Sequence, residues 1–88
     1  MKQIKYHKQF IKSYIKRVKG NSVLEDKFKQ RLELLLKTPE DKVLRRHRLK
    51  GLLSEFMSFS VAGDVRVIYK EYAYSVLLFD IGSHNQVY

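Results

Sequence analysis

The sequence has 88 residues, enough for one domain spanning residues 1–88, and a formal net charge of +9 from 18 Lys and Arg against 9 Asp and Glu. It contains no cysteine, which excludes a disulfide framework and a thiolate metal site. No apolar run approaches the roughly 20 residues of a membrane span, and the first residues lack the apolar core of a secretory signal. We therefore expect a cytoplasmic protein with no membrane partner.

A short strand and a basic amphipathic helix are expected first. Residues 3–6 alternate polar and apolar side chains, which is typical of a strand. From His7 to a stop near Gly20, apolar residues recur with helical spacing and should form one buried face: Phe10, Ile11, Tyr14, Ile15 and Val18. The rest of the helix is basic, because residues 1–20 carry seven Lys and Arg and no Asp or Glu. His7 is expected on the surface.

A second helix should follow at once. Ser22 and Glu25 have the spacing of a capping box, which predicts that Ser22 is the N-cap and that the helix follows it. The helix should end at Thr38-Pro39, since the residue before proline avoids the α conformation. Its buried face would comprise Leu24, Phe28, Leu32, Leu35 and Leu36. The two helices are expected to form a helical hairpin.

Residues 40–51 are charged and show no period, so they are expected to be a connecting loop. This segment holds a second basic cluster, Arg45-Arg46-His47-Arg48-Leu49-Lys50. Two basic clusters on a small domain favour a polyanion such as nucleic acid as partner. An acidic protein partner or a solvated surface are the alternatives.

A β-hairpin is expected next, because residues 57–61 and 65–70 alternate apolar and polar side chains. A three-residue loop, Ala62-Gly63-Asp64, keeps apolar residues opposite one another. The resulting pairs are Met57 with Tyr69, Phe59 with Val67 and Val61 with Val65, while Ser60 lies opposite Arg66 on the polar face.

The last strand should be internal, since residues 75–81 are apolar on both faces. The sequence therefore predicts an α+β fold: an N-terminal strand, a two-helix hairpin and a three-stranded antiparallel meander. The helices would pack on one face of the sheet. The other face, with Ser60 and Arg66, would stay open.

Two histidines are candidates for acid–base chemistry. His47 lies among cations that disfavour a further positive charge, so a neutral imidazole is expected there, suited to take a proton from a ribose hydroxyl. His84 follows the inner strand and Gly82, and could give a proton to the departing oxygen. The alternative for each is an exposed histidine without a catalytic role.

RNA cleavage without a metal needs alignment, a base, an acid and cations, because the ribose 2′-hydroxyl is itself the nucleophile. Arg66, with Arg48 or Lys50, could supply the cations. Asp64 could orient a histidine, act as base, or only hydrogen-bond within its turn. Tyr88 could stack on a base or cover the core edge. No phosphate-binding Gly-rich loop, nucleophile elbow or metal-ligand cluster is present, so no cofactor or small-molecule substrate is expected.

Three segments carry a family resemblance: Arg46-His47-Arg48-Leu49-Lys50-Gly51, residues 59–70 with Arg66-Val67-Ile68-Tyr69, and Gly82-Ser83-His84-Asn85-Gln86-Val87-Tyr88. Over residues 44–88 the chain resembles the RelE superfamily of bacterial toxins, and within it the YafQ branch. The resemblance implies a metal-independent endoribonuclease that enters the ribosomal A site and cleaves the mRNA being read. It also implies a cognate antitoxin as partner.

The resemblance assigns roles to residues of this chain. His47, Asp64 and His84 match acting residues of the YafQ site, and Tyr88 matches its terminal aromatic residue. Arg66 matches a strand arginine that RelE-type toxins use on phosphate. The catalytic set expected here is therefore His84, His47, Asp64 and Arg66, with Arg48, Lys50, Ser60 and Tyr88 binding the substrate.

Two positions depart from the pattern. The YafQ pattern has a histidine where this chain has Ser60 and a tryptophan where it has Val65. Serine can donate a hydrogen bond but is no base at neutral pH. Two alternatives therefore stay open: a ParE-like toxin that poisons DNA gyrase, against which His84 argues, and a catalytically weak relative that mainly binds its antitoxin. The basic N-terminal residues would contact ribosomal RNA or that antitoxin.

Overall fold

The computed structural model describes residues 2–88, and these form a mixed sheet covered by helices. The five strands, in the order β1-β5-β4-β3-β2, are β1 (Gln3–Tyr6), β2 (His47–Arg48), β3 (Met57–Ala62), β4 (Val65–Glu71) and β5 (Ser75–Ser83). The helices are α1 (Lys8–Arg17), α2 (Ser22–Lys37) and α3 (His84–Val87), and the 3-10 turns are η1 (Lys42–Leu44) and η2 (Gly51–Leu53). β1 runs parallel to β5, and the other neighbouring strands are antiparallel.

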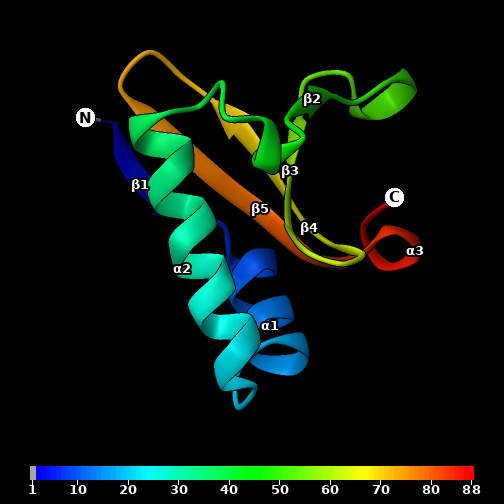
Figure 1. Ribbon diagram of the computed structural model, residues 1–88. Coiled ribbons are helices and arrows are strands. Elements are labelled where there is room, and N and C mark those ends of the chain that lie inside the picture. Colours follow the sequence, from blue (N-terminus) through cyan, green and yellow to red (C-terminus); the bar gives the residue numbers. More distant parts are fainter. Residues whose placement is uncertain (1) are drawn as a thin grey trace.

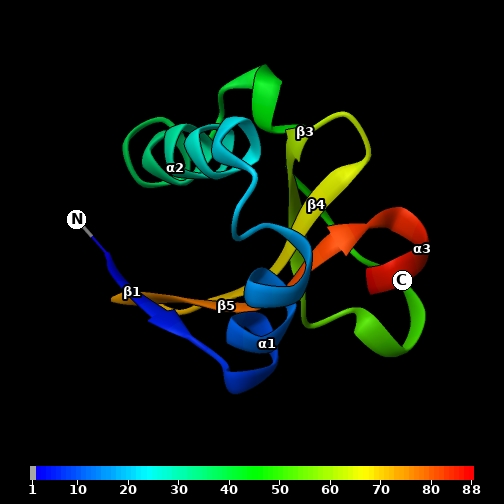
Figure 2. The same cartoon turned by 90° about the horizontal axis from the view of Figure 1, so that it is seen from below.

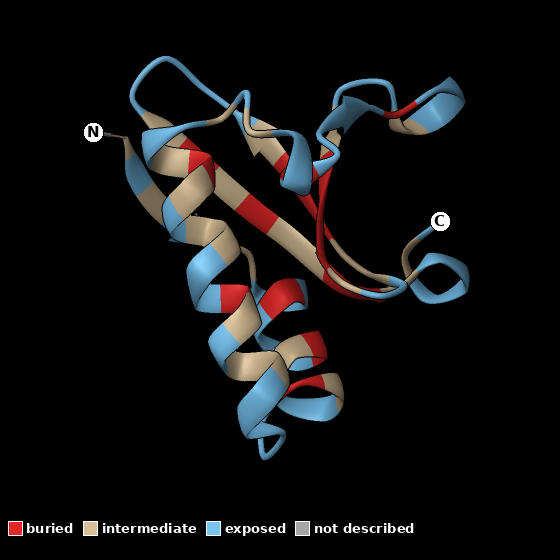
Figure 3. Ribbon diagram, in the orientation of Figure 1, coloured by how far each residue is buried: buried red, intermediate tan, exposed pale blue. Residues whose placement is uncertain are grey.

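The α+β prediction is confirmed, including the N-terminal strand, the helical hairpin and the β3-β4-β5 meander (Figure 1). Seen from below, α1 lies along β5 and α2 lies beside β3 (Figure 2). Buried positions lie where these helices and the sheet face one another (Figure 3). Phe59, Val67 and Ile81 are fully buried in this core. Within residues 2–88, no helix is both long enough and apolar enough to cross a membrane.

The helices differ from the sequence prediction in two details. Asn21, not Ser22, caps α2: its side chain accepts the Leu24 N–H at 3.1 Å, so the expected capping box is wrong by one residue. Ile11 and Ile15 of α1 are 47% and 56% exposed instead of buried. Because α1 covers the sheet only along β5, a narrower stripe of the helix faces the core than its apolar pattern suggests.

Residues 40–51 are not the plain connecting loop that was expected. Leu44 is fully buried and Leu49 is 8% exposed, so both ends of the basic run are anchored in the protein. Between them, β2 pairs with β3, with His47 opposite Ser58 and Arg48 opposite Met57. A two-residue strand has no visible period, which is why the sequence did not indicate it.

The hairpin register is confirmed for Met57 with Tyr69, Phe59 with Val67 and Ser60 with Arg66. The pairing of Val61 with Val65 is wrong, because an irregularity between Ser60 and Ala62 brings Ala62 opposite Val65. The turn then has two residues, and its Gly63 adopts φ +54°, a conformation that favours glycine.

The second face of the sheet is less open than predicted. Ser58 is fully buried and Ser60 is 8% exposed, although both alternate with core residues of β3. The segment after η1 pairs with β3, and the C-terminal helix α3 lies against β5 and β4 (Figures 1 and 2). Tyr88, at the end of the chain, hydrogen-bonds to Ser58.

Candidate active site

The pairing of β2 with β3 positions the His47 side chain. His47 is exposed, and its Nδ1 lies 3.1 Å from the Arg45 carbonyl oxygen. A carbonyl can only accept a hydrogen bond, so this contact places a proton on Nδ1 and leaves Nε2 facing away from the Arg45 carbonyl. Arg45 adopts φ +49°, which is uncommon for a residue other than glycine. The chain therefore turns sharply just before His47 and orients its imidazole.

The tail that carries His84 is a single helical turn held by its own cap. Ser83 is the N-cap, and its backbone N–H donates to Gln86 Oε1 at 2.7 Å. The Tyr88 N–H donates to the His84 carbonyl at 3.0 Å. Gly82 permits this packing, since a Cβ there would lie 2.7 Å from both Gln86 Oε1 and Arg17 Nη1. The turn is thus fixed although it is only four residues long.

The β2 segment and the tail enclose one groove of about 320 Å³. Its lining brings together five of the predicted site residues with two leucines: His47, Arg48, Leu49, Lys50, Leu53, His84 and Tyr88. Two imidazoles, two cations and an aromatic ring therefore share one surface, although they come from segments far apart in the sequence.

Asp64 connects the hairpin turn to the tail. Its Oδ2 accepts the His84 backbone N–H at 3.3 Å, and its Oδ1 lies 4.0 Å from Arg66 Nε. The Arg66 side chain is 22% exposed, and its Nε is enclosed without a hydrogen-bond partner among residues 2–88. Of the roles considered for Asp64, this geometry favours orientation of the His84 segment.

Ser60 and Tyr88 take different places. Ser60 is buried beside Arg66 in the sheet and does not line the groove. Tyr88 does line it: the ring is edge-on to the His84 imidazole with centroids 4.4 Å apart, and the hydroxyl donates to Ser58 Oγ at 2.9 Å.

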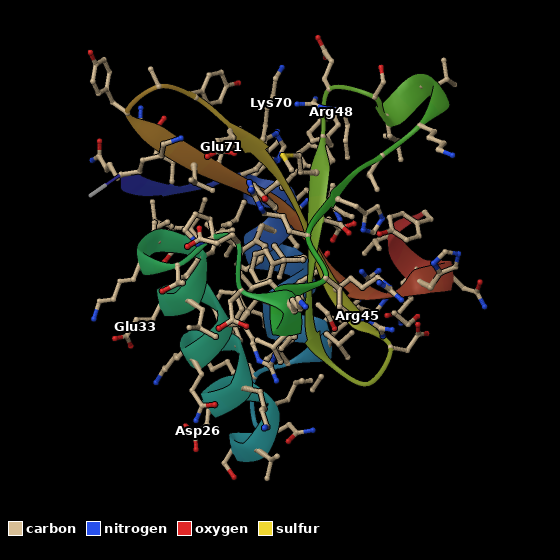
Figure 4. All side chains as sticks on the ribbon, turned by 45° about the horizontal axis from the view of Figure 1, so that its top comes forward. Asp26, Glu33, Arg45, Arg48, Lys70 and Glu71 are labelled. Carbon is tan, nitrogen blue, oxygen red and sulfur yellow. The ribbon has the colours of Figure 1, made fainter. Side chains whose placement is uncertain are left out.

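The basic residues do not form one continuous cluster. Arg46 turns away from the groove and lies 3.5 Å from Glu71, which also pairs with Lys2 at 2.7 Å. Figure 4 shows the side chains of Arg45 and Arg48 well apart. Arg48 donates to the Ser54 carbonyl at 3.1 Å, which holds it against the loop beside the groove. Only part of the basic run therefore faces the candidate site.

Arg46 instead contacts the core. Burial raises the pKa of the Tyr69 hydroxyl above its usual value, while a hydrogen bond from Arg46 acts in the opposite direction. Tyr69 is fully buried on β4, so this arginine covers the edge of the core.

Sequence reasoning missed Ser58 and Leu49. Ser58 alternates with the core residues of β3, a pattern that predicts an exposed polar position, although the structure buries it completely. Leu49 stood within a charged run that showed no period. His7, expected to be only a surface residue, accepts the Gln9 N–H and caps α1. In the described part of the chain, no three His, Asp or Glu side chains converge in a way that could hold a metal ion.

Comparisons with known proteins identify the family of the chain. Residues 2–88 match the family described as "Bacterial toxin of type II toxin-antitoxin system, YafQ". No curated protein is close enough in sequence to count as a relative.

Several solved structures share the fold. YafQ from E. coli strain BL21(DE3) has 24% sequence identity and a TM-score of 0.79, with 100% of this chain and 99% of that chain covered. YafQ in the E. coli DinJ-YafQ complex has 25% identity, the same coverage and a TM-score of 0.78. A copper-bound mutant toxin from Helicobacter pylori has 27% identity and a TM-score of 0.76, with both chains fully covered. With the family match over nearly its whole length, the chain belongs to the YafQ family of bacterial type II toxins.

Proposed function

We propose that this chain is a ribosome-dependent endoribonuclease, which cleaves mRNA in the A site by attack of the ribose 2′-hydroxyl on the adjacent phosphate and so inhibits translation. The observation that carries the proposal is the groove in which His47, His84, Arg48 and Lys50 meet. Such a reaction needs a base, an acid and positive charge at one place, and no protein nucleophile.

His47 is the proposed general base. Its Nδ1 is engaged by the Arg45 carbonyl, so Nε2 of the neutral ring is the nitrogen available to accept the 2′-hydroxyl proton. His84 is the proposed general acid, which protonates the departing 5′-oxygen. Both side chains are exposed and line the same groove, as contact with an RNA strand requires.

The phosphate would be held by cations. Arg48 and Lys50 line the groove, and Arg66 lies beside Asp64 at the tail. Each can stabilise the negative charge that develops on the phosphorane oxygens. Asp64 is proposed to orient His84 through its backbone N–H. Ser60 is 8% exposed, so a hydrogen bond from it to RNA would need a local rearrangement; it remains the weakest of the proposed substrate contacts.

The proposed partners are the ribosome with its mRNA, and a cognate antitoxin. The family is one of toxin–antitoxin systems, and E. coli YafQ has been solved in complex with DinJ. Exposed lysines of α1, such as Lys8, Lys12 and Lys16, supply charge for ribosomal RNA or for an acidic antitoxin. Action on the ribosome would place the protein in the cytoplasm.

Primer extension on mRNA from cells that express the chain tests the proposal. We expect cuts in phase with codons, and a loss of about 10²- to 10⁴-fold in His84→Ala, the usual contribution of a general acid. His7→Asn is the matched control, because it also removes an imidazole but keeps a residue that caps helices well.

The same cells distinguish the alternatives. Intact mRNA together with DNA breaks would overturn the proposal in favour of a gyrase poison. Intact mRNA without DNA damage, from a chain that still binds its antitoxin, would indicate a catalytically inactive relative.

A further inference from the structure

Ser58 lies beneath the groove, and its role is not explained by packing alone. Its side chain on β3 is completely buried. A buried hydroxyl needs a hydrogen-bond partner, and Ser58 Oγ accepts one from the Tyr88 hydroxyl at 2.9 Å. This bond joins the end of the chain to the middle of the sheet.

Ser58 is also the cross-strand neighbour of His47. The two residues lie directly opposite each other in the β2–β3 pair. Residues so placed point to the same face, with Cβ atoms about 4.5–5.5 Å apart. The position of the His47 side chain over the sheet is thereby tied to that of Ser58.

Tyr88 makes the corresponding contact on the other side of the groove. Its ring is edge-on to the His84 imidazole at 4.4 Å between centroids, and its backbone N–H bonds to the His84 carbonyl. The hydrogen bond from the Tyr88 hydroxyl to Ser58 anchors the outer end of the tyrosine side chain. The ring that this bond holds in place then sets where the His84 imidazole lies.

We propose that Ser58 and Tyr88 act as a positioning pair that fixes the spacing between the His47 and His84 imidazoles. The inference rests on the proposed ribonuclease function, in which these histidines are base and acid. It gives Tyr88 a role other than base stacking, because its hydroxyl is already engaged and one part of its ring is packed on His84. Neither residue of the pair transfers a proton.

The expected effect follows from the geometry of the reaction. Base and acid must reach the attacking and departing oxygens together, and a small misplacement of catalytic groups is costly. Loss of one neutral hydrogen bond should lower the cleavage rate roughly three- to tenfold. The KM for programmed ribosomes should not change, since neither hydroxyl that is removed is free to contact RNA.

A double-mutant cycle with Ser58→Ala and Tyr88→Phe tests the pair on purified ribosomes. Each change removes one end of the same hydrogen bond, so the double variant should be no slower than either single variant. Two controls remove comparable hydroxyls elsewhere: Ser13→Ala, a buried serine on α1, and Tyr74→Phe, an exposed tyrosine. Unchanged kcat in both single variants, or strictly additive losses, would overturn the pairing.

Nuclear magnetic resonance of the free protein separates this inference from the proposed function. The Tyr88 ring should shift the resonances of the His84 ring protons and give cross-relaxation to them. Both the ring-current shift and the cross-relaxation should become smaller in Ser58→Ala but not in Ser13→Ala. If the wild-type chain cuts no mRNA while these signals behave as expected, the ribonuclease function fails and the positioning pair stands. If Ser58→Ala leaves the signals unchanged, the pair is refuted whatever the activity.

Discussion

Replacement of Asp64 separates its proposed role, orientation of His84, from the alternative role of general base. The structure gives it two contacts, an N–H···O bond of 3.3 Å from His84 and an approach of 4.0 Å to Arg66 Nε. A hydrogen bond to a charged group contributes roughly 1.5–3 kcal/mol. This one is long, and the carboxylate is 63% exposed, so about 1 kcal/mol is the appropriate magnitude.

The ion pair with Arg66 adds little. At 4.0 Å and with an exposed carboxylate, it contributes about 0.5 kcal/mol or less because solvent screens it. Asp64→Ala should therefore lower stability by about 1–1.5 kcal/mol, which lowers the Tm of a domain this size by about 4–12 °C. Asp64→Asn keeps an acceptor for the His84 N–H and should lose roughly half as much.

Cleavage by the Asn variant decides between the roles. If Asp64 only orients His84, Asp64→Asn should cut within about threefold of the wild-type rate, because the acceptor is retained. If Asp64 were the general base, the rate should fall about 10²- to 10⁴-fold. Single-turnover cleavage and thermal unfolding are measured together, with Asp26→Asn on α2 as a control for loss of a carboxylate. An Asn variant that is folded and as inactive as His84→Ala would refute the orienting role.

Three further outcomes are expected. Gly82→Ala should cost about 1 kcal/mol of unfolding free energy in urea, because the new methyl group would push aside the ends of the Gln86 and Arg17 side chains and the hydrogen bonds they make; an unchanged midpoint would contradict the tail packing. The folded-state pKa of Tyr69 is raised, so its contribution to stability is complete below the unfolded pKa, near 10, and is lost as pH rises through the folded value. Wild type should thus lose more unfolding free energy above pH 10 than Tyr69→Phe does. Urea titrations that give the same pH dependence of unfolding free energy for both proteins would contradict this. Arg48→Ala and Lys50→Ala should weaken binding to programmed ribosomes and reduce its salt dependence. Filter binding at several salt concentrations measures the slope of log affinity against log salt, and an unchanged slope would refute phosphate binding by these two residues.

The parts of the fold that were predictable depend on local patterns. Phe59 and Val67 were paired correctly because side chains alternate on both strands and the connecting turn is short. Phe28 and Leu35 were correctly assigned to the buried face of α2, since their spacing matches the helical repeat. Such patterns arise from neighbours in the sequence and need no knowledge of the rest of the chain.

The parts that were not predictable depend on distant neighbours. Ile11 and Ile15 fit the apolar face of α1, but which part of that face is covered depends on where β5 and α2 lie. The irregularity near Val61 leaves the alternation on each strand intact, so the sequence carries no sign of it. β2 and α3 are too short to show a period.

The candidate site shows the same division. His47 and His84 were chosen by residue type, by their flanking residues and by the family resemblance. Their meeting in one groove requires that Leu44 and Leu49 anchor the basic segment and that the tail folds back onto β3. Ser58 could not be found in this way, because a serine between core residues of a strand reads as an exposed polar position.

The central claim is that the 2′-hydroxyl of mRNA attacks the adjacent phosphate in the groove between His47 and His84. The most direct test uses purified ribosomes with a defined codon in the A site and an mRNA that carries one 2′-deoxynucleotide at the mapped cut. We predict that wild-type protein cleaves the all-ribose mRNA only when it is bound to the ribosome, and leaves the substituted position intact. Cleavage at the 2′-deoxy position, or no cleavage of the all-ribose mRNA on the ribosome, would contradict the account.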